Sequence, residues 1–445
     1  MGHQHADLVL LHPVGDGGLQ HGGHLRAAAR LSGVNGALIP MKRLLRVIGK
    51  LLKFAVLAFL VVVVTLAAFI GYLAIARNAA LALPAPTGSY AVGRSEFNWV
   101  DPARPDPLAD QGSAPRELVV WVWYPAAQVG TTPAPYLPPI WVQARNQDQG
   151  GLGKLIENDF NRFQTHSYES AALAAVPAAF PVLILEPGMG PIATDYTVFA
   201  ENLASHGYIV VGINPTDTAN TTVFLDGKVV LRTAKGTIPD NATPAEAAAD
   251  ANRIEAVWQQ DELFVLDQLA TLNAAQSSFF NHRLDLQHIG EWGHSFGGAT
   301  ALGLCQTDPR CQAGVDMDGT PTGNEITVAV PKPFMFMTED YSTGCDQGCA
   351  AMRQVFLNTK AGAAYSLSIA GTRHFNFSDL PYRQVGLVEP LFVVAGYEGT
   401  IQPRRGLKIM NAYLVAFFDQ YLKGIQGDLL QGPDSAYHEV TFEKH

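Results

Sequence analysis

One long apolar segment constrains this chain more than any other feature. Phe54 to Ala76 (FAVLAFLVVVVTLAAFIGYLAIA) contains no charged residue, and as a helix it is long enough to cross the roughly 30 Å hydrocarbon core of a bilayer. Basic residues crowd its N-terminal side, whereas only Arg77 follows closely on the other side. The positive-inside rule therefore predicts a cytoplasmic N-terminus and export of everything downstream. The basic residues before the span are Lys42, Arg43, Arg46, Lys50 and Lys53.

Cleavage of this segment as a signal peptide is the competing interpretation. The stretch ALALPAP after the segment supports it, but the apolar run exceeds the roughly 7–15 residues of a signal-peptide core. We therefore expect an uncleaved signal anchor. The chain would then be a single-pass membrane protein with an extracytoplasmic folded domain, and secretion after signal cleavage is the alternative.

Composition divides the chain into four segments. Residues 1–40 are rich in Gly and His and show no periodicity. They are either a disordered tail or an over-extended start, because the basic run begins directly after Met41. Histidines scattered through such a segment give a metal ion no fixed geometry. Residues 41–77 are the basic flank and transmembrane anchor, 78–87 are a Pro-containing linker, and 88–445 are expected to form one folded domain.

The charge balance and the absence of known cofactor motifs argue against several functional classes. The formal net charge of −10 argues against nucleic-acid binding, because that needs a basic surface to neutralise phosphates. The sequence has no zinc-type spacing of Cys and His, no P-loop and no dinucleotide-binding glycine pattern. We therefore expect no metal and no cofactor, and nothing indicates an obligate protein partner.

The four cysteines all fall in the part predicted to be exported. An even number of cysteines there indicates disulfides. Of the three possible connectivities, we expect the two local pairs, Cys305 with Cys311 and Cys345 with Cys349.

From about residue 88 the hydrophobic pattern alternates between strands and helices. This alternation predicts an α/β fold with a mostly parallel central sheet and helices on both faces. The segment 181–188 (PVLILEPG) is almost continuously apolar, as expected for a buried parallel strand. An Asp226-Gly227 turn predicts a small hairpin that can form part of a lid. Further strands are expected at 116–126, 209–215, 313–318, 333–338 and 365–371 and before Gly293, and helices at 196–203, 252–272 and 410–422 and after Ser295.

The stretch EWGHSFGGAT, residues 291–300, places Ser295 between glycines. A G-x-S-x-G sequence between a strand and a helix is typical of a nucleophile elbow, in which a strained turn lifts the serine hydroxyl above the sheet edge. Side chains two residues before and after the serine would collide there. Gly293 and Gly297 meet that steric requirement, so Ser295 is the predicted nucleophile, and a purely structural turn is the alternative.

A serine hydroxyl needs a base to take its proton and a third group to orient that base. In this fold the acid and the histidine follow the nucleophile in that order. His374 lies in a loop after an expected strand, whereas His438 lies in the polar tail, so His374 is the predicted base. Which carboxylate is the acid is undecided at this point, because four of them lie near the ends of expected strands. They are Asp316, Asp318, Glu339 and Asp340.

The acyl-transfer mechanism also needs two backbone N–H groups aimed at the developing oxyanion. Phe296 supplies one as the residue after the nucleophile. The glycine-rich stretch EPGMG, 186–190, can supply the other from Met189.

Three stretches resemble the plasma-type platelet-activating factor acetylhydrolases, which are serine-dependent α/β-hydrolases. GHSFGGAT is similar to their nucleophile motif, LASHGYIVV to their helix-to-strand turn, and HFNFSD to their histidine loop. The resemblance covers roughly residues 88–425. Asp318 follows Ser295 by 23 residues, as the acid does in this family, so the resemblance favours Asp318 over its rival Asp340.

The resemblance implies metal-free hydrolysis of carboxylic esters, with short or oxidised acyl chains at the sn-2 position of phospholipids as the family's substrates. A cutinase-like polyester esterase and a serine peptidase of the same fold are the alternative enzymes. A membrane-tethered binding module that has lost catalysis is the alternative outside enzymes. The expected partners are thus a small-molecule or lipid ester and the membrane.

Two glutamates depart from the family pattern. Glu186 stands in EPG where the family has a Ser-His-Gly-type oxyanion loop, and Glu291 stands where the strand before the elbow is usually apolar. Because their strands are neighbours in this fold, desolvation and repulsion are expected to raise at least one of the two pKa values. We hypothesise that the two share a proton or a buried cation beneath the site; two separate salt bridges are the alternative.

Overall fold

The computed structural model describes residues 40–445 except 111–113, 149–152, 343, 346 and 360–363. The expected tail at 1–40 therefore lies almost entirely outside the described residues. The chain separates into a unit that ends at Thr65 and a unit from Leu66 to His445. In the described part of the chain, α1 (Met41–Ala76) is the one helix long and apolar enough to cross a membrane, and its most apolar window is not buried. It thus has the length and composition of a signal anchor or a signal peptide.

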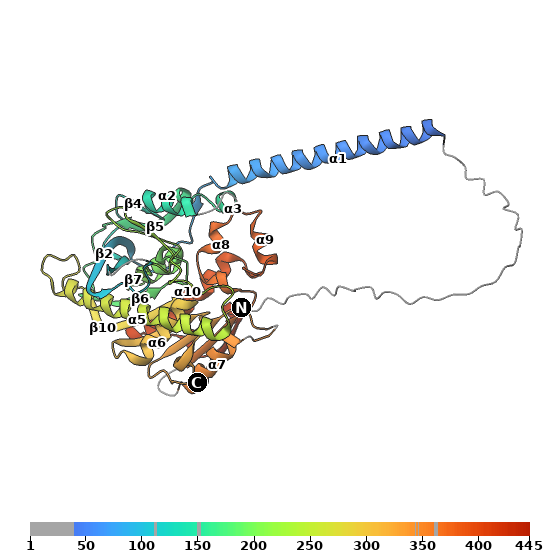
Figure 1. Cartoon of the computed structure of the whole chain (residues 1–445). Helices are drawn as coiled ribbons and strands as arrows, with labels where there is room; N and C mark the ends of the chain where they lie inside the picture. Colours follow the sequence, from blue (N-terminus) through green and yellow to red (C-terminus); the bar gives the residue numbers. More distant parts are fainter. Residues whose placement is uncertain (1–39, 111–113, 149–152, 343, 346, 360–363) are drawn as a thin grey trace, which may run out of the picture. The chain divides into compact units, whose positions relative to one another are not determined.

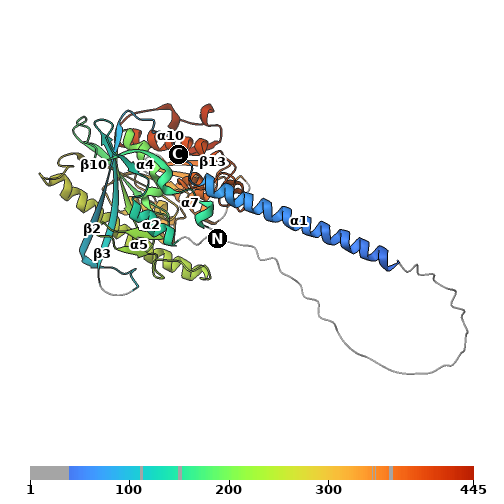
Figure 2. The same ribbon diagram turned by 90° about the horizontal axis from the view of Figure 1, so that it is seen from above.

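The second unit is built on a twelve-stranded, mostly parallel sheet. Its strand order is β1-β5-β2-β3-β7-β6-β10-β11-β12-β13-β14, and β4 pairs with β5. The run from β7 to β13 is parallel throughout, whereas β2, β3 and β7 are antiparallel neighbours. Figure 2 shows β2 and β3 as long strands side by side. The strands are β1 (Leu81–Ala82), β2 (Ala91–Pro105), β3 (Pro115–Ala126), β4 (Pro133–Pro135), β5 (Phe163–Glu169), β6 (Phe180–Glu186), β7 (Ile209–Asn214), β10 (Leu284–His294), β11 (Cys311–Met317), β12 (Phe334–Thr338), β13 (Ala364–Ile369) and β14 (Val440–Lys444).

Helices cover both faces of the sheet, which confirms the predicted α/β-hydrolase architecture. All seven residues of β6 are buried: Leu183 and Leu185 face the layer of α4 and α10, and Val182 and Ile184 face α5. Figure 1 shows α5 and α6 over the strands on one side. This burial on both faces explains the continuous apolar run in the sequence. The helices are α2 (Pro139–Asp148), α3 (Gly153–Ile156), α4 (Thr197–Ser205), α5 (Pro244–Ala274), α6 (Phe296–Thr307), α7 (Gln347–Asn358), α8 (Leu380–Arg383), α9 (Glu389–Val394) and α10 (Pro403–Leu422).

Helix α5 begins earlier than the apolar periodicity indicates. Thr243 accepts a hydrogen bond from the Glu246 N–H, and the Glu246 side chain returns to Thr243. This capping box, with Pro244 at the first helical position, starts the helix in a polar stretch. Apolar spacing indicates only the buried part of a helix, so the prediction missed the first two turns of α5.

Several elements of the architecture, including β1, β2, β5, α7 and β14, were not predicted. Leu81 and Ala82, in the predicted linker, form β1 and pair with β5, and β5 itself was not anticipated. The expected hairpin around Asp226-Gly227 is present, with β8 (Thr221–Val223) antiparallel to β9 (Val229–Leu231).

Both expected disulfides are formed. Cys305 is joined to Cys311, and Cys345 is joined to Cys349. All four cysteines of the chain are therefore oxidised, which is typical of a domain outside the cytoplasm.

Candidate active site

Ser295 occupies the sharp turn between β10 and α6. Its backbone has φ 58° and ψ −124°, a conformation that costs an L-residue energy and is found mainly at functional sites. A Cβ added to Gly297 would lie well inside 3.0 Å of the carbonyl oxygens of Glu186 and Pro187, and one on Gly293 would meet the Gly297 carbonyl in the same way. Glycines therefore surround this hydroxyl because neighbouring backbone already fills the space that a side chain would need.

The structure brings the predicted nucleophile, base and acid together. His374 Nε2 lies 2.9 Å from Ser295 Oγ, and His374 Nδ1 lies 2.7 Å from Asp318 Oδ2. Because a carboxylate can only accept, Nδ1–H donates to Asp318, and the bare Nε2 is left to accept the serine proton. Burial lowers the pKa of His374, but the hydrogen bond and charge of Asp318 outweigh it and raise the pKa overall.

Asp318 is held at the exit of β11 by a second unusual backbone conformation, with φ 57°. Its N–H donates to the carbonyl of Met337 at 2.7 Å, and its Oδ1 accepts the Glu339 N–H at 2.9 Å. The carboxylate is thus fixed on both sides, with Oδ2 aimed at His374. Asp318 is buried, at 5% exposure, whereas the His374 side chain is 38% exposed.

The other candidate acids have different partners. Asp340 accepts backbone N–H groups from Ser342 and Gly371, and its pKa is lowered by the Ser342 side chain and by these two backbone bonds. Asp316 is fully buried beneath the elbow and accepts the Gly319 N–H at 2.7 Å. Burial raises the pKa of Asp316 to about 8. Neither of these carboxylates is hydrogen-bonded to His374.

Of the two predicted oxyanion donors, Met189 lies in the loop after β6 and Phe296 is the first residue of α6. A Cβ on Gly188, the residue before Met189, would lie 3.3 Å from the Ser295 Cβ, so this loop reaches Ser295. Within the described part of the chain, neither the Met189 N–H nor the Phe296 N–H has a hydrogen-bond partner. Both side chains pack against the cluster of Leu108, Ile254 and Trp258.

His294 and Tyr196 are site residues that the sequence analysis did not identify. Both are buried, and their side chains lie 2.9 Å apart, from Tyr196 Oη to His294 Nδ1. Tyr196 also accepts the Gly188 N–H, and His294 Nε2 lies 2.9 Å from the carbonyl oxygen of His374. A histidine inside the elbow motif and a hydroxyl on an apolar helix face are the signals that could have indicated them.

Glu186 and Glu291, the two glutamates that differ from the family pattern, are both buried, with exposed fractions of 1% and 0%. A third glutamate, Glu262 of α5, is also fully buried. Burial raises all three pKa values well above the usual range, and mutual repulsion adds to the effect for Glu186 and Glu262. Neither Glu186 nor Glu291 has an ion-pair partner among the described residues, so separate salt bridges do not explain them.

No group of three or more His, Cys, Asp and Glu residues in the described part of the chain is arranged to hold a metal ion. The three buried glutamates therefore do not form such a metal-binding group. Burial and repulsion both favour the protonated forms of these carboxyls, which agrees with the hypothesis of a shared proton.

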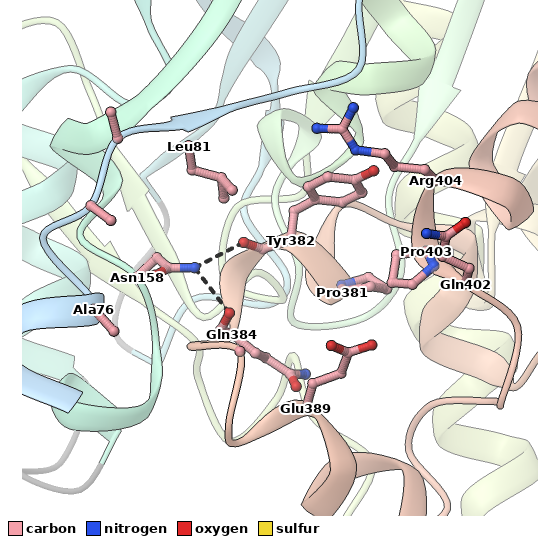
Figure 3. Close-up of a pocket in the computed structure, with 13 residues that line it drawn as sticks. Ala76, Leu81, Asn158, Pro381, Tyr382, Gln384, Glu389, Gln402, Pro403 and Arg404 are labelled. Carbon is pink, nitrogen blue, oxygen red and sulfur yellow. Dashed lines mark hydrogen bonds between the residues drawn. The ribbon is translucent and has the colours of Figure 1, made fainter. Parts of the chain in front are cut away.

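A separate cavity of about 430 Å³ lies between the end of α1, α8 and the start of α10. Figure 3 shows Tyr382, Glu389 and Arg404 around it, with Asn158 bonded to the carbonyls of Tyr382 and Gln384. None of Ser295, Asp318 and His374 lines this cavity. It is therefore distinct from the candidate catalytic site.

Comparison with known proteins agrees with this geometry. The model of the family "Platelet-activating factor acetylhydrolase, isoform II" matches residues 75–437. A probable 1-alkyl-2-acetylglycerophosphocholine esterase of Arthroderma benhamiae is 25% identical over 390 residues, covering 81% of this chain and 93% of that protein. The platelet-activating factor acetylhydrolase of Bos taurus is 25% identical over 299 residues, covering 63% of this chain and 65% of that protein.

A solved structure carries the same architecture. The ferulic acid esterase from Streptomyces cinnamoneus superimposes with a TM-score of 0.67 at 26% identity, covering 82% of this chain and 99% of that one. The resemblance seen in the sequence motifs and the prediction of a serine-dependent ester hydrolase are thus confirmed. The chain belongs to the family of platelet-activating factor acetylhydrolase, isoform II, and is a serine ester hydrolase with the α/β-hydrolase fold.

Proposed function

We propose that this enzyme hydrolyses short-acyl or lipid carboxylic esters through an acyl-enzyme on Ser295. The observation that carries the proposal is the continuous hydrogen-bond path from Ser295 Oγ through His374 to Asp318, with distances of 2.9 and 2.7 Å. Such a path lets the imidazole take the serine proton while the carboxylate stabilises the resulting imidazolium.

In the first half of the reaction, Ser295 Oγ attacks the ester carbonyl carbon and its proton passes to His374 Nε2. The carbonyl oxygen becomes an oxyanion, to which the N–H groups of Met189 and Phe296 donate hydrogen bonds. When the tetrahedral intermediate collapses, the bond to the alcohol breaks and His374 returns the proton to the leaving oxygen.

In the second half, water attacks the acyl-enzyme. His374 Nε2 takes a proton from the water, the second tetrahedral intermediate forms in the same oxyanion site, and its collapse releases the carboxylic acid. The proton then returns to Ser295 Oγ, so the enzyme ends in its starting state. Asp318 keeps the imidazole in the tautomer needed for both halves.

The raised pKa of His374 favours its protonated form in both intermediates. The same shift means that the free enzyme loses its base as the pH falls. The enzyme is therefore expected to work best at neutral to alkaline pH.

Replacement of Ser295 tests the proposal directly. Ser295→Ala removes the nucleophile, so hydrolysis of a short p-nitrophenyl ester and labelling by a fluorophosphonate probe should both be abolished. Ser89→Ala, at an exposed serine, is the matched control and should behave as wild type. Turnover by Ser295→Ala, with its thermal unfolding unchanged, would refute the assignment.

A panel of esters addresses the substrate class. We expect turnover of p-nitrophenyl acetate and of a phospholipid with a short sn-2 acyl chain, and a decline as that chain lengthens. Preferred cleavage of a polyester film or of a peptide amide would instead support the cutinase-like or the peptidase alternative. The comparison is made with the same preparation, so that differences in folding do not enter.

We also propose that α1 is an uncleaved anchor with the catalytic unit on the extracytoplasmic side. The two disulfides and the basic residues at the N-terminal end of α1 support this orientation. Because the four native cysteines are paired, Gly427→Cys introduces a single reactive thiol at an open position. A membrane-impermeant maleimide should label that thiol on spheroplasts, and labelling only after lysis would overturn the orientation.

A further inference from the structure

A chain of hydrogen bonds connects the oxyanion loop to the backbone of His374. It runs from the Gly188 N–H to Tyr196 Oη, from there to His294 Nδ1, and from His294 Nε2 to the His374 carbonyl oxygen. Each of the three heavy-atom distances is 2.9 Å. None of these contacts belongs to the Ser295–His374–Asp318 path described above.

The proton positions in this chain follow from the chemistry of its two ends. The His374 carbonyl can only accept, so His294 Nε2 must carry the hydrogen. A neutral imidazole then has a bare Nδ1, which accepts the Tyr196 O–H, and Tyr196 Oη is left to accept the Gly188 N–H. Every donor therefore meets an acceptor, and the four groups have a single consistent arrangement.

Burial keeps both side chains in the required forms. Tyr196 is 0% and His294 is 1% exposed. Burial lowers the pKa of His294 well below its usual range, and the charge that develops on His374 lowers it further. Burial also raises the pKa of Tyr196, so its hydroxyl stays a donor.

The aromatic contacts fix the same rings. The His294 ring neighbours those of His374 and Phe377, with centroid separations of 4.6 and 6.2 Å. The Tyr196 ring packs on His294 at 5.8 Å. Movement of either ring would therefore be transmitted to the loop that carries the catalytic base.

We propose that Tyr196 and His294 are positioning residues that hold the oxyanion loop and the His374 loop in one fixed relation to each other. This inference rests on the proposed function of Ser295 and His374. Tyr196 binds the Gly188 N–H and so orients the loop that presents the Met189 N–H. His294 binds the carbonyl oxygen of His374 and so holds the His374 ring in line with Ser295 and Asp318. Their role is in the reaction geometry, so their loss should affect kcat more than KM.

Tyr196→Phe removes one hydroxyl and leaves the ring in place. The Gly188 N–H loses its acceptor, so kcat should fall by about 10-fold, less than the 10²- to 10³-fold loss of a whole oxyanion donor. KM and the acid limb of the pH profile should stay close to wild type, because Asp318 still orients His374. Tyr208→Phe is the matched control, since Tyr208 is equally buried and its hydroxyl donates to Asp419 at 2.7 Å.

Two replacements separate the halves of the His294 contact. In His294→Asn the Oδ1 atom can still accept from Tyr196, but the bond to the His374 carbonyl is lost. In His294→Gln the amide can still donate to that carbonyl, but the acceptor for Tyr196 is lost. We expect His294→Asn to lower kcat and to move the acid limb of kcat/KM to lower pH, and His294→Gln to lower kcat with the limb in place.

Two results would overturn the inference. One is wild-type kcat in Tyr196→Phe and His294→Asn when Ser295→Ala is inactive, which would leave the proposed function standing and remove only the positioning role. The other is a histidine nitrogen NMR spectrum of the unmodified enzyme that shows His294 protonated at Nδ1 instead of Nε2. The spectrum needs no substitution, so the inference remains testable even where a variant does not fold.

Discussion

Replacing Gly297 by alanine should impair catalysis through backbone displacement alone. The new methyl group would lie well inside 3.0 Å of the carbonyl oxygens of Glu186 and Pro187, whereas favourable contacts lie near 3.5 Å, so the two segments must separate by about 1 Å. These carbonyls belong to the segment that leads into Met189, so the separation moves one oxyanion donor away from Ser295. A displacement of this size is expected to lower kcat by about 10²-fold and to cost about 1–3 kcal/mol of stability.

The assay is the steady-state hydrolysis of p-nitrophenyl acetate, with thermal unfolding measured on the same samples. Gly432→Ala is the matched control, because nothing lies within 4 Å of a Cβ at that position. It should leave both kcat and the melting temperature unchanged. A Gly297→Ala enzyme with wild-type kcat would refute the reasoning, because the oxyanion loop would then not depend on this close approach.

Three further predictions concern the acid, the base and the buried carboxyls. Asp318→Asn should lower kcat by about 10³- to 10⁴-fold through loss of the His374 tautomer, and Asp340→Asn should leave it near wild type; the reverse ranking in an esterase assay would move the acid to Asp340. In a pH series, kcat/KM should fall as the pH drops through the pKa of His374, which lies above 6.5, and an acid limb below 6.5 would contradict that shift. Because the pKa of Glu291 is raised in the folded state, stability should decrease as the pH rises above about 4.5, by at most about 1.4 kcal/mol per pH unit for this group. Urea unfolding at several pH values should show a shallower decrease in Glu291→Gln, and an unchanged slope would show that Glu291 stays ionised.

Much of this architecture could be predicted because buried parallel strands leave a plain sequence signal. The run that became β6 is apolar on both faces, and the packing of α4, α10 and α5 on the two sides explains why. The elbow was equally visible, since its glycines are required by the close approach of backbone. Short strands such as β1 gave no signal, because their residues are placed by pairing with a distant strand.

The site was predictable to the extent that its chemistry is tied to local motifs. The positions of Ser295 and His374 follow from an elbow and from a loop after a strand. Local sequence left Asp340 as a serious rival to Asp318, because each follows a strand; in the structure the turn at φ 57° aims Asp318 at His374. The partnership of Tyr196 with His294 joins positions 98 apart in the chain, and no periodicity encodes such a contact.

The disulfide between Cys305 and Cys311 joins the helix that starts just after Ser295 to the strand that ends just before Asp318. Ser295 and Asp318 therefore lie at the far ends of the two elements that this disulfide joins. A chain kept among cytosolic thiols would lose this disulfide, and with it about 2 kcal/mol of folding stability that comes from restricting the unfolded chain. Export and oxidation would then be steps in the maturation of the catalyst itself, and a preparation made under reducing conditions would contain a less stable enzyme with the same sequence.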